Sequence, residues 1–274
     1  MTPHRLGALG ERNYRLLWIG RSVSLLGDQI APVALALDGA TGTDTVIVWD
    51  FDGTLAHRPG LWRGCLTEIL DTHVPGHGIH ADDLLPYLRR GFPWDSPDVA
   101  HPELSDPDRW WESLQPLLES AYRGAGFDDR DARRFARLVR AHYTDPTRGW
   151  TLFPDTIPVL RKLGALGWRH AILSNHVPEL PAIVAGLGLD ALVEVTVTSA
   201  AIGFEKPNPA AFEHVLRECG RPGRVWMVGD NPAADVAGAE ALGIPAILVR
   251  AASGAKRCAA DLHEAATIIE QAPY

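Results

Sequence analysis

The 274-residue sequence is poor in cysteine, in positive charge and in long apolar runs. Its three cysteines, Cys65, Cys219 and Cys258, are widely spaced and form no Cys-x-x-Cys pair. We therefore expect reduced thiols in a cytoplasmic protein rather than a disulfide framework. Lys and Arg number 26 against 34 Asp and Glu, a net charge of −8, which disfavours general nucleic-acid binding because that needs a basic surface.

Membrane insertion is also disfavoured. The most apolar part of the first 44 residues is interrupted by Arg21 and Asp28. It therefore falls short of the roughly 20 continuous apolar residues that a membrane helix needs. A cleaved secretory signal is disfavoured because the charged part is long and the uninterrupted apolar part is short.

The most informative segment that is present spans residues 46–55. An apolar run ends in Asp50-Phe51-Asp52-Gly53-Thr54. Residues two apart on a strand point to the same side, so Asp50 and Asp52 can converge where the strand stops. Asp50 could then attack phosphorus while Asp52 protonates the leaving oxygen and later activates water. The plainer interpretation is a strand that ends in an Asp-Gly turn.

Three further apolar runs, at residues 171–173, 193–197 and 225–228, also lead into polar residues. These are Ser174 with Asn175 after the first run, Lys206 after the second, and Asp230 with Asp235 after the third. In open parallel sheets, sites form at the carboxyl ends of the strands. We therefore expect these side chains at one edge of a sheet with Asp50 and Asp52.

Four residues are predicted to bind phosphate. Thr54 would offer its hydroxyl, and the backbone N–H groups of Gly53 and Thr54 would face phosphate oxygens. Ser174 would donate a hydrogen bond together with Asn175, and Lys206 would neutralise charge there.

A magnesium site is predicted beside them. Mg2+ usually takes one or two protein carboxylates plus water and substrate phosphate, which suits Asp50 and Asp230 with the carbonyl of Asp52. Asp235 would orient Lys206 or a metal-bound water without touching the metal.

The remaining pattern predicts an α/β fold. Residues 151–249 alternate helix-like and strand-like segments, as in a doubly wound parallel sheet. Residues 57–150 instead have few β-branched residues, and apolar spacing predicts helices over 61–70 and 132–142. Prolines between positions 75 and 107 should break the middle of this insertion into short pieces.

Together these motifs resemble the haloacid dehalogenase-like hydrolase superfamily. The resemblance covers residues from about 45 to 250 and rests on Asp50 to Leu55, Ser174-Asn175, Lys206-Pro207, and Gly229 to Asp235. Residues 203–209 and 235–239 look like the branch of phosphoglycolate phosphatase-like and nucleotidase-like enzymes. The resemblance implies a Rossmann-like core, Asp50 as nucleophile, Asp52 as general acid and base, and Mg2+ as cofactor. Dehalogenase members generally lack the second carboxylate, so Asp52 favours phosphoryl transfer.

The resemblance also sets the expected domains. The core would comprise residues 45–56 and 151–252, and the insertion 57–150 would form a helical cap that closes over the site. Residues 253–274 would form a C-terminal helix or tail, and residues 1–44 an N-terminal extension. Residues 1–40 resemble the first segment of a major facilitator superfamily transporter. This extension is interpreted as a fusion remnant, with a membrane anchor or a wrongly assigned start as alternatives.

Other residues have weaker functional interpretations. His57, Arg58 and Arg63 could contact substrate, although exposed loop positions are the plainer account. Four tryptophans could form an aromatic wall, although core packing is commoner for such residues; they are Trp62, Trp94, Trp110 and Trp111. The spacing of His73, His77 and His80 suits zinc, but without a strong fourth ligand polar loop histidines are favoured.

The sequence as a whole predicts a Mg2+-dependent phosphatase that acts on a small phosphorylated metabolite through an aspartyl-phosphate intermediate. A phosphotransferase such as a sugar-phosphate mutase would use the same residues, and a non-catalytic membrane-associated binding module is the alternative from another class. The protein is expected to be a monomer or a homodimer.

Overall fold

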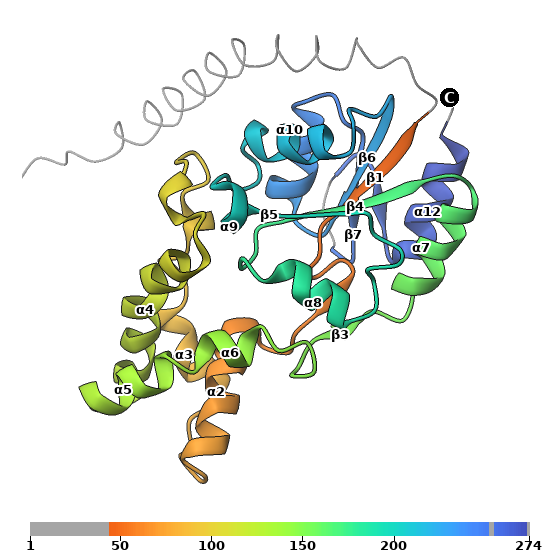
Figure 1. The fold of residues 1–274 in the computed structure, drawn as a ribbon. Helices are drawn as coiled ribbons and strands as arrows, with labels where there is room; N and C mark the ends of the chain where they lie inside the picture. The colour runs from red at the N-terminus through yellow and green to blue at the C-terminus, as the bar shows by residue number, and fades with distance from the viewer. Residues whose placement is uncertain (1–43, 252–254, 273–274) are drawn as a thin grey trace, which may run out of the picture.

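The computed structural model describes residues 44–251 and 255–272 (Figure 1). The transporter-like segment, and with it nearly all of the N-terminal extension, lies outside the described residues. In the part of the chain that is described, no helix combines the length and the apolar character that a membrane span needs.

A six-stranded parallel sheet forms the centre of the molecule, which confirms the expected α/β fold. Across the sheet the strands are β5 (Val195–Thr198), β4 (Arg169–Ser174), β1 (Thr45–Trp49), β6 (Arg224–Gly229), β7 (Ala246–Val249) and β8 (Cys258–Ala259). Trp49, the last residue of β1, pairs with Ile172 of β4 and with Val228 of β6. The strands therefore end nearly level, and the loops that follow them share one edge of the sheet.

Each face of the sheet carries its own apolar core because alternate strand residues point to opposite faces. Ile47 and Trp49 pack on the face covered by α7 (Thr156–Ala165) and α12 (Leu262–Gln271). Val46 and Val48 pack on the other face, which α10 (Pro209–Glu218) covers. With helices on both faces, β1 is almost wholly buried, and this explains its unbroken apolar run.

The C-terminal segment is part of this layered structure. β8 pairs with β7, and α12 buries Leu262 and Ile269 in the same core as α7. The described chain thus ends in a helix, α12, that packs against the sheet.

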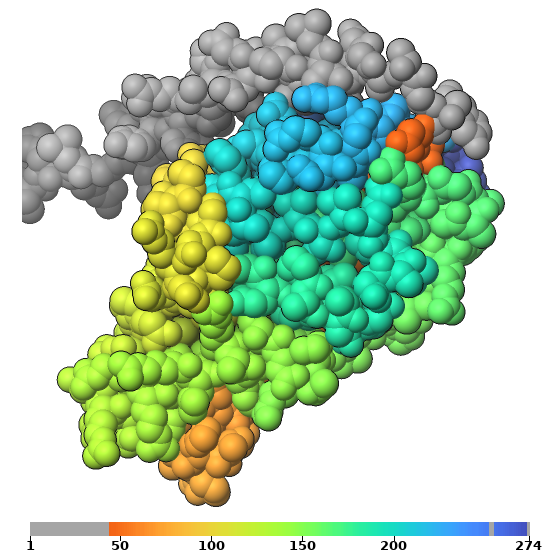
Figure 2. Space-filling view, in the orientation of Figure 1, coloured from red at the N-terminus to blue at the C-terminus, as the bar shows by residue number. Residues whose placement is uncertain are grey.

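The segment between β2 (Ala56–His57) and β3 (Thr151–Leu152), which pair antiparallel, is largely helical. It contains α2 (Leu61–His73), α3 (Ala81–Leu84), α4 (Pro107–Gly124), α5 (Asp129–Ala136) and α6 (Val139–Tyr143), with three short 3₁₀ turns at Leu85–Tyr87, Pro93–Asp95 and Pro102–Leu104. These turns lie within the proline-rich stretch that was expected to be broken. Figure 2 shows the segment, in orange to yellow-green, as a lobe beside the rest of the molecule.

The helix predicted over 132–142 is wrong in one respect, because two helices replace it. The N–H of Leu138 donates to the carbonyl of Phe135 at 2.9 Å, three residues back, so the α-helical ladder stops there. Phe135 and Val139 are nevertheless both buried. The apolar spacing correctly predicted which residues are buried, but it did not indicate the break between the two helices.

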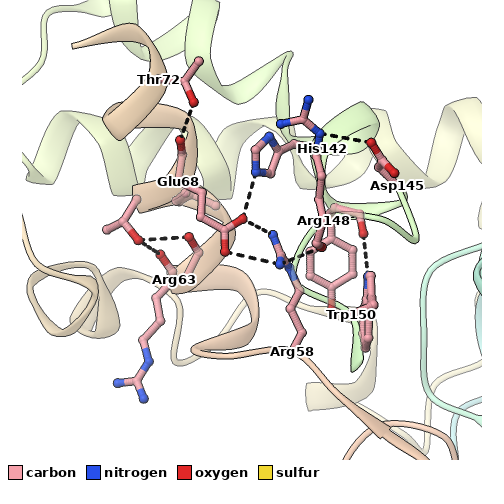
Figure 3. Close-up of polar contacts among 12 residues, drawn as sticks. Arg58, Arg63, Glu68, Thr72, His142, Asp145, Arg148 and Trp150 are labelled. Carbon is pink, nitrogen blue, oxygen red and sulfur yellow. Dashed lines mark hydrogen bonds and ion pairs between the residues drawn. The ribbon is translucent and has the colours of Figure 1, made fainter. Parts of the chain in front are cut away.

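An ion pair between the buried Arg58 and the partly exposed Glu68 ties the start of this lobe to its end (Figure 3). The Arg58 guanidinium is fully covered and donates to Glu68 Oε2 at 2.5 Å and to the carbonyl of Arg148 at 3.1 Å. His142 Nε2 lies 2.8 Å from the same Glu68 oxygen. Arg58 is thus neither an exposed loop residue nor one of the residues that line the cavity described below; it joins α2 to the chain that leads into β3.

Removing the carboxylate should destabilise the protein strongly. In Glu68→Ala the buried Arg58 guanidinium keeps one carbonyl acceptor, and an unpaired buried charge costs about 3 kcal/mol, or roughly 6–12 °C in Tm. Thermal denaturation measures the change. The matched control is Asp82→Ala, which breaks the exposed Arg63–Asp82 pair and should leave Tm nearly unchanged. Equal changes in Tm for the two substitutions would contradict a stabilising role for the Arg58–Glu68 pair.

Candidate active site

The polar residues that follow the strands meet in one cavity of about 340 Å³. Seven of the eight predicted site residues line it: Asp50, Asp52, Ser174, Asn175, Lys206, Asp230 and Asp235. They lie at the end of β4 or on the segments that follow β1, β4, β5 and β6, so the level strand ends place them together. The exception is Thr54.

Lys206 is the positive centre of this cavity. Its Nζ lies 2.8 Å from Asp50 Oδ1 and 2.6 Å from Asp235 Oδ1, and the residue is 2% exposed. Burial alone would lower the pKa of Lys206, but the adjacent carboxylates of Asp235 and Asp50 outweigh it and raise that pKa above its ordinary value. The side chain is therefore a permanent ammonium. Ser174 Oγ donates to the same Asp50 oxygen at 2.8 Å.

Asn175 fixes the backbone of Lys206. Its Nδ2 donates to the Lys206 carbonyl at 2.9 Å, and its Oδ1 accepts from the Lys206 N–H at 2.7 Å. This two-point contact joins the loop after β4 to the loop after β5. Asn175 thus positions Lys206, which is a different task from the phosphate contact predicted for it.

Asp235 is held by the short π-helical segment η4 (Pro232–Ala237). The N–H of Asn231 donates to Asp235 Oδ2 at 2.9 Å, while Lys206 occupies Oδ1. The Asn231 side chain caps the segment by accepting from the N–H groups of Ala233 and Ala234. Both Asp235 oxygens therefore have partners within the protein, as expected for a residue that orients Lys206.

The remaining carboxylates suit a divalent cation. Asp50, Asp230 and Asp235 can bring one oxygen each to within 4.8 Å of one another. Burial, followed by the charges of Asp50 and Asp235, raises the pKa of Asp230 to about 7. Burial and then the charge of Asp50 also raise the pKa of Asp52 well above its usual range. One ammonium offsets only part of the negative charge that these four carboxyl groups carry when ionised, and oxygen donors of this kind fit Mg2+. Because Asp235 is already occupied, Asp50 and Asp230 are the better ligands.

Gly53 lets Asp230 approach the loop after β1. Gly53 has φ +84°, and a Cβ built on it would lie 2.2 Å from Asp230 Oδ2. Any side chain at position 53 would therefore push the Asp230 carboxylate away from Asp50.

Gly53→Ala should consequently lower kcat/KM for a reaction catalysed in this cavity by about 100-fold, the cost of displacing a catalytic group by an ångström or so. If Asp230 holds a divalent cation, the variant should also bind that cation more weakly. Gly76→Ala is the matched control, since Gly76 has φ +80° but nothing within 4 Å of its Cβ position. If both variants lose the same amount of activity, backbone strain and not Asp230 explains the effect.

The prediction for the glycine turn itself is corrected by the structure. The N–H of Gly53 donates to the Ala56 carbonyl at 2.8 Å, and that of Thr54 to the Phe51 carbonyl at 3.3 Å. Because the loop folds back toward β2, both N–H groups already donate to carbonyls within the loop and do not face phosphate. The Thr54 side chain is fully buried, its hydroxyl has no hydrogen-bond partner, and it does not line the cavity.

Sequence reasoning missed several residues that line the cavity. Tyr143 lies at the end of α6, and nothing in its sequence neighbourhood marks it. His176 and Asn231 each directly follow a predicted site residue, and that adjacency was an available signal. Burial lowers the pKa of His176 to about 4, so its ring is neutral.

The weaker candidates divide between cavity and core. Trp62 and Trp94 line the cavity, whereas Trp110 and Trp111 are buried at 1% and 3% exposure and do not. The three zinc candidates belong to none of the possible metal clusters among the described residues, and His77 is 3.0 Å from Asp71 Oδ1.

Comparison with known proteins agrees with this geometry. The family model described as haloacid dehalogenase-like hydrolase matches residues 45–243. Phosphoglycolate phosphatase of Rhodospirillum rubrum is 30% identical over 214 residues, which are 74% of this chain and 78% of that protein. Haloacid dehalogenase-like hydrolase domain-containing protein 3 of Homo sapiens is 27% identical over 74% of this chain and 81% of its own.

A shorter sequence match and a solved structure also resemble this chain. Glyceraldehyde 3-phosphate phosphatase of Methanothermobacter thermautotrophicus is 38% identical over 100 residues, 35% of this chain and 44% of that protein. The solved structure of the HAD-hydrolase YfnB from Bacillus subtilis bound to magnesium superposes with a TM-score of 0.63 at 16% identity, over 84% of this chain and 100% of that one. The structure thus shares that fold, and the chain belongs to the haloacid dehalogenase-like hydrolase family.

Proposed function

We propose that this protein is a Mg2+-dependent phosphatase that hydrolyses the monoester of a small phosphorylated metabolite through a phosphorylated Asp50. The observation that carries the proposal is the environment of Asp50, whose Oδ1 accepts hydrogen bonds from Ser174 and Lys206 while Asp52 lines the same cavity. Relatives named as phosphatases of small metabolites support it.

In the first step a carboxylate oxygen of Asp50 attacks the phosphorus atom. The new P–O bond to Asp50 forms as the P–O bond to the leaving alcohol breaks, and Asp52 gives its proton to the departing oxygen. Lys206 donates its remaining N–H to a phosphoryl oxygen, and Ser174 turns its hydroxyl from Asp50 to another, which offsets the negative charge of the phosphoryl group.

In the second step a water molecule replaces the alcohol. Asp52, now a carboxylate, takes a proton from that water as its oxygen attacks phosphorus. The bond between phosphorus and Asp50 breaks, inorganic phosphate leaves, and the Asp50 carboxylate is restored. When bound between Asp50 and Asp230, Mg2+ would supply further charge neutralisation for the phosphoryl group.

The helical lobe would serve as the cap of this enzyme. Its residues Leu61, Trp62, Trp94 and Tyr143 already form part of the cavity wall. Such a cap excludes water from the phosphorylated intermediate until the alcohol has left. We also propose a cytoplasmic location, which the free thiols of Cys65 and Cys219 support.

Phosphate release from a panel of phosphate monoesters, with Mg2+ and with EDTA, tests the proposal. Release should require Mg2+ and should fall to background in EDTA. Faster transfer to an added alcohol or sugar than to water would instead indicate a phosphotransferase. Absence of metal-dependent release from every member would contradict catalysis and favour a binding module.

A further inference from the structure

The wall of the cavity contributed by the helical lobe is aromatic. Trp62 stacks on Tyr143 with ring centroids 4.2 Å apart and planes 9° from parallel. Trp94 stacks in the same way on Phe92, at 4.7 Å and 7°. Trp62 and Trp94 lie 6.4 Å apart by their centroids. Each ring is thereby fixed before any ligand enters, which lowers the entropy cost of binding against it.

The cavity has little positive charge of its own. Among the described residues, Lys206 is the only lysine or arginine that lines the cavity. Its ammonium already forms ion pairs with Asp50 and Asp235. The Arg58 guanidinium lies over the Tyr143 ring, 5.6 Å from its centroid, but it is fully buried and directed at Glu68 and the Arg148 carbonyl. Arg63 pairs with Asp82. In the part of the chain that the structure describes, no guanidinium or ammonium of the lobe lines the cavity.

The negative charge of the cavity also disfavours a second anionic group on the substrate. Asp50, Asp230 and Asp235 line the cavity against one ammonium, while Asp52 is protonated when substrate binds. A phosphate group can be balanced by Lys206, Ser174 and the cation. A carboxylate at the far end of the substrate would lose water, find no second cation and lie in a negative field, and burying a charge without a counter-ion is costly.

We propose that the leaving group of the natural substrate is an uncharged aromatic or apolar alcohol or phenol, bound against Trp62, Trp94 and Tyr143. Carboxylated phosphates such as 2-phosphoglycolate are then poor substrates, unlike the substrate in the name of the Rhodospirillum rubrum relative. The inference rests on the proposed phosphatase function and narrows its substrate class.

Phenyl phosphate and 4-carboxyphenyl phosphate form a matched pair of substrates that differ by one carboxylate. The carboxylate makes the phenol a slightly better leaving group, so chemistry alone favours the charged ester. We expect kcat/KM at least tenfold higher for phenyl phosphate, and a similar or larger advantage of benzyl phosphate over 2-phosphoglycolate. Trp94→Ala should reduce the value for phenyl phosphate by about tenfold, since an aromatic pair contributes up to about 1.5 kcal/mol beyond its buried area.

A charge introduced at Leu61 gives the reverse test. Leu61 lines the cavity and is 40% exposed, so a polar side chain there does not enter the core. Leu61→Arg should raise kcat/KM for 4-carboxyphenyl phosphate at least fivefold relative to Leu61→Gln, a neutral side chain of comparable length. Equal values for the two variants would contradict the claim that a missing cation excludes the carboxylate.

The outcomes separate this inference from the function on which it rests. If hydrolysis requires Asp50 but the carboxylated esters react as fast as the neutral ones, the inference is overturned and the phosphatase stands. If no ester is hydrolysed, the phosphatase fails, and binding decides the inference. Phenylphosphonate, which has no hydrolysable ester, should then bind at least tenfold more tightly than 4-carboxyphenylphosphonate by calorimetry; equal affinity would overturn the inference.

Discussion

Asp50→Asn should lower kcat for phosphate-ester hydrolysis by a factor on the order of 10^4 or more, as removal of a nucleophile does in other enzymes. The amide keeps the shape of the carboxylate and can still accept hydrogen bonds from Ser174 and Lys206, but it cannot form the bond to phosphorus. Initial rates of phosphate release at saturating substrate and Mg2+ measure the change.

The fold of this variant should be intact, because Lys206 retains Asp235 as a buried partner at 2.6 Å. Circular dichroism and Tm check this. Asp190→Asn, a substitution of the same kind at an exposed position, is the control for preparation and should retain full activity. Activity of Asp50→Asn within tenfold of the wild type would contradict the assignment of Asp50.

Lys206→Met should affect both stability and catalysis. Methionine fills much of the volume but leaves Asp50 and Asp235 without their buried cation, and breaking a buried pair in this way costs about 3–5 kcal/mol. Loss of a charge donor to the phosphoryl group should also lower kcat by about 10^2–10^3. Denaturant unfolding and phosphate release measure the two effects.

A second substitution separates them. The double variant Lys206→Met/Asp235→Asn removes one of the two carboxylates that Lys206→Met leaves without a cation. Much of the lost stability should therefore return. Activity should not return, because the donor to phosphate is still missing. A single variant as stable as the wild type, or a double variant that regains activity, would show that Lys206 does not have the role described here.

The arrangement of the site was predictable because it depends on a simple rule of parallel sheets. Apolar runs at residues 46–49, 171–173 and 225–228 had to be central strands, and polar residues directly after them had to share an edge. Lys206 lies eight residues beyond β5, yet it could still be assigned from Lys206-Pro207 and the order of the motifs. Local sequence was sufficient for the residues that directly follow the strands, and Lys206 needed the motif order as well.

Other features depend on contacts between distant segments and were not predictable. The Arg58–Glu68 pair requires that α2 and the approach to β3 lie side by side, and no local pattern shows this. Gly53 and Thr54 had suitable chemistry, but the fold of the loop toward Ala56 uses their N–H groups. Trp62 and Trp94 line the cavity and Trp110 does not, a difference that tertiary packing decides.

The proposed mechanism requires a covalent bond between Asp50 and phosphorus. Acid quenching during turnover, followed by borohydride reduction, converts an aspartyl phosphate to homoserine, and peptide mass spectrometry locates it. We expect homoserine at position 50 in the wild type with Mg2+, and none in Asp50→Asn or in EDTA. Steady turnover with no reduced residue at position 50, or with the modification on another side chain, would contradict the central claim.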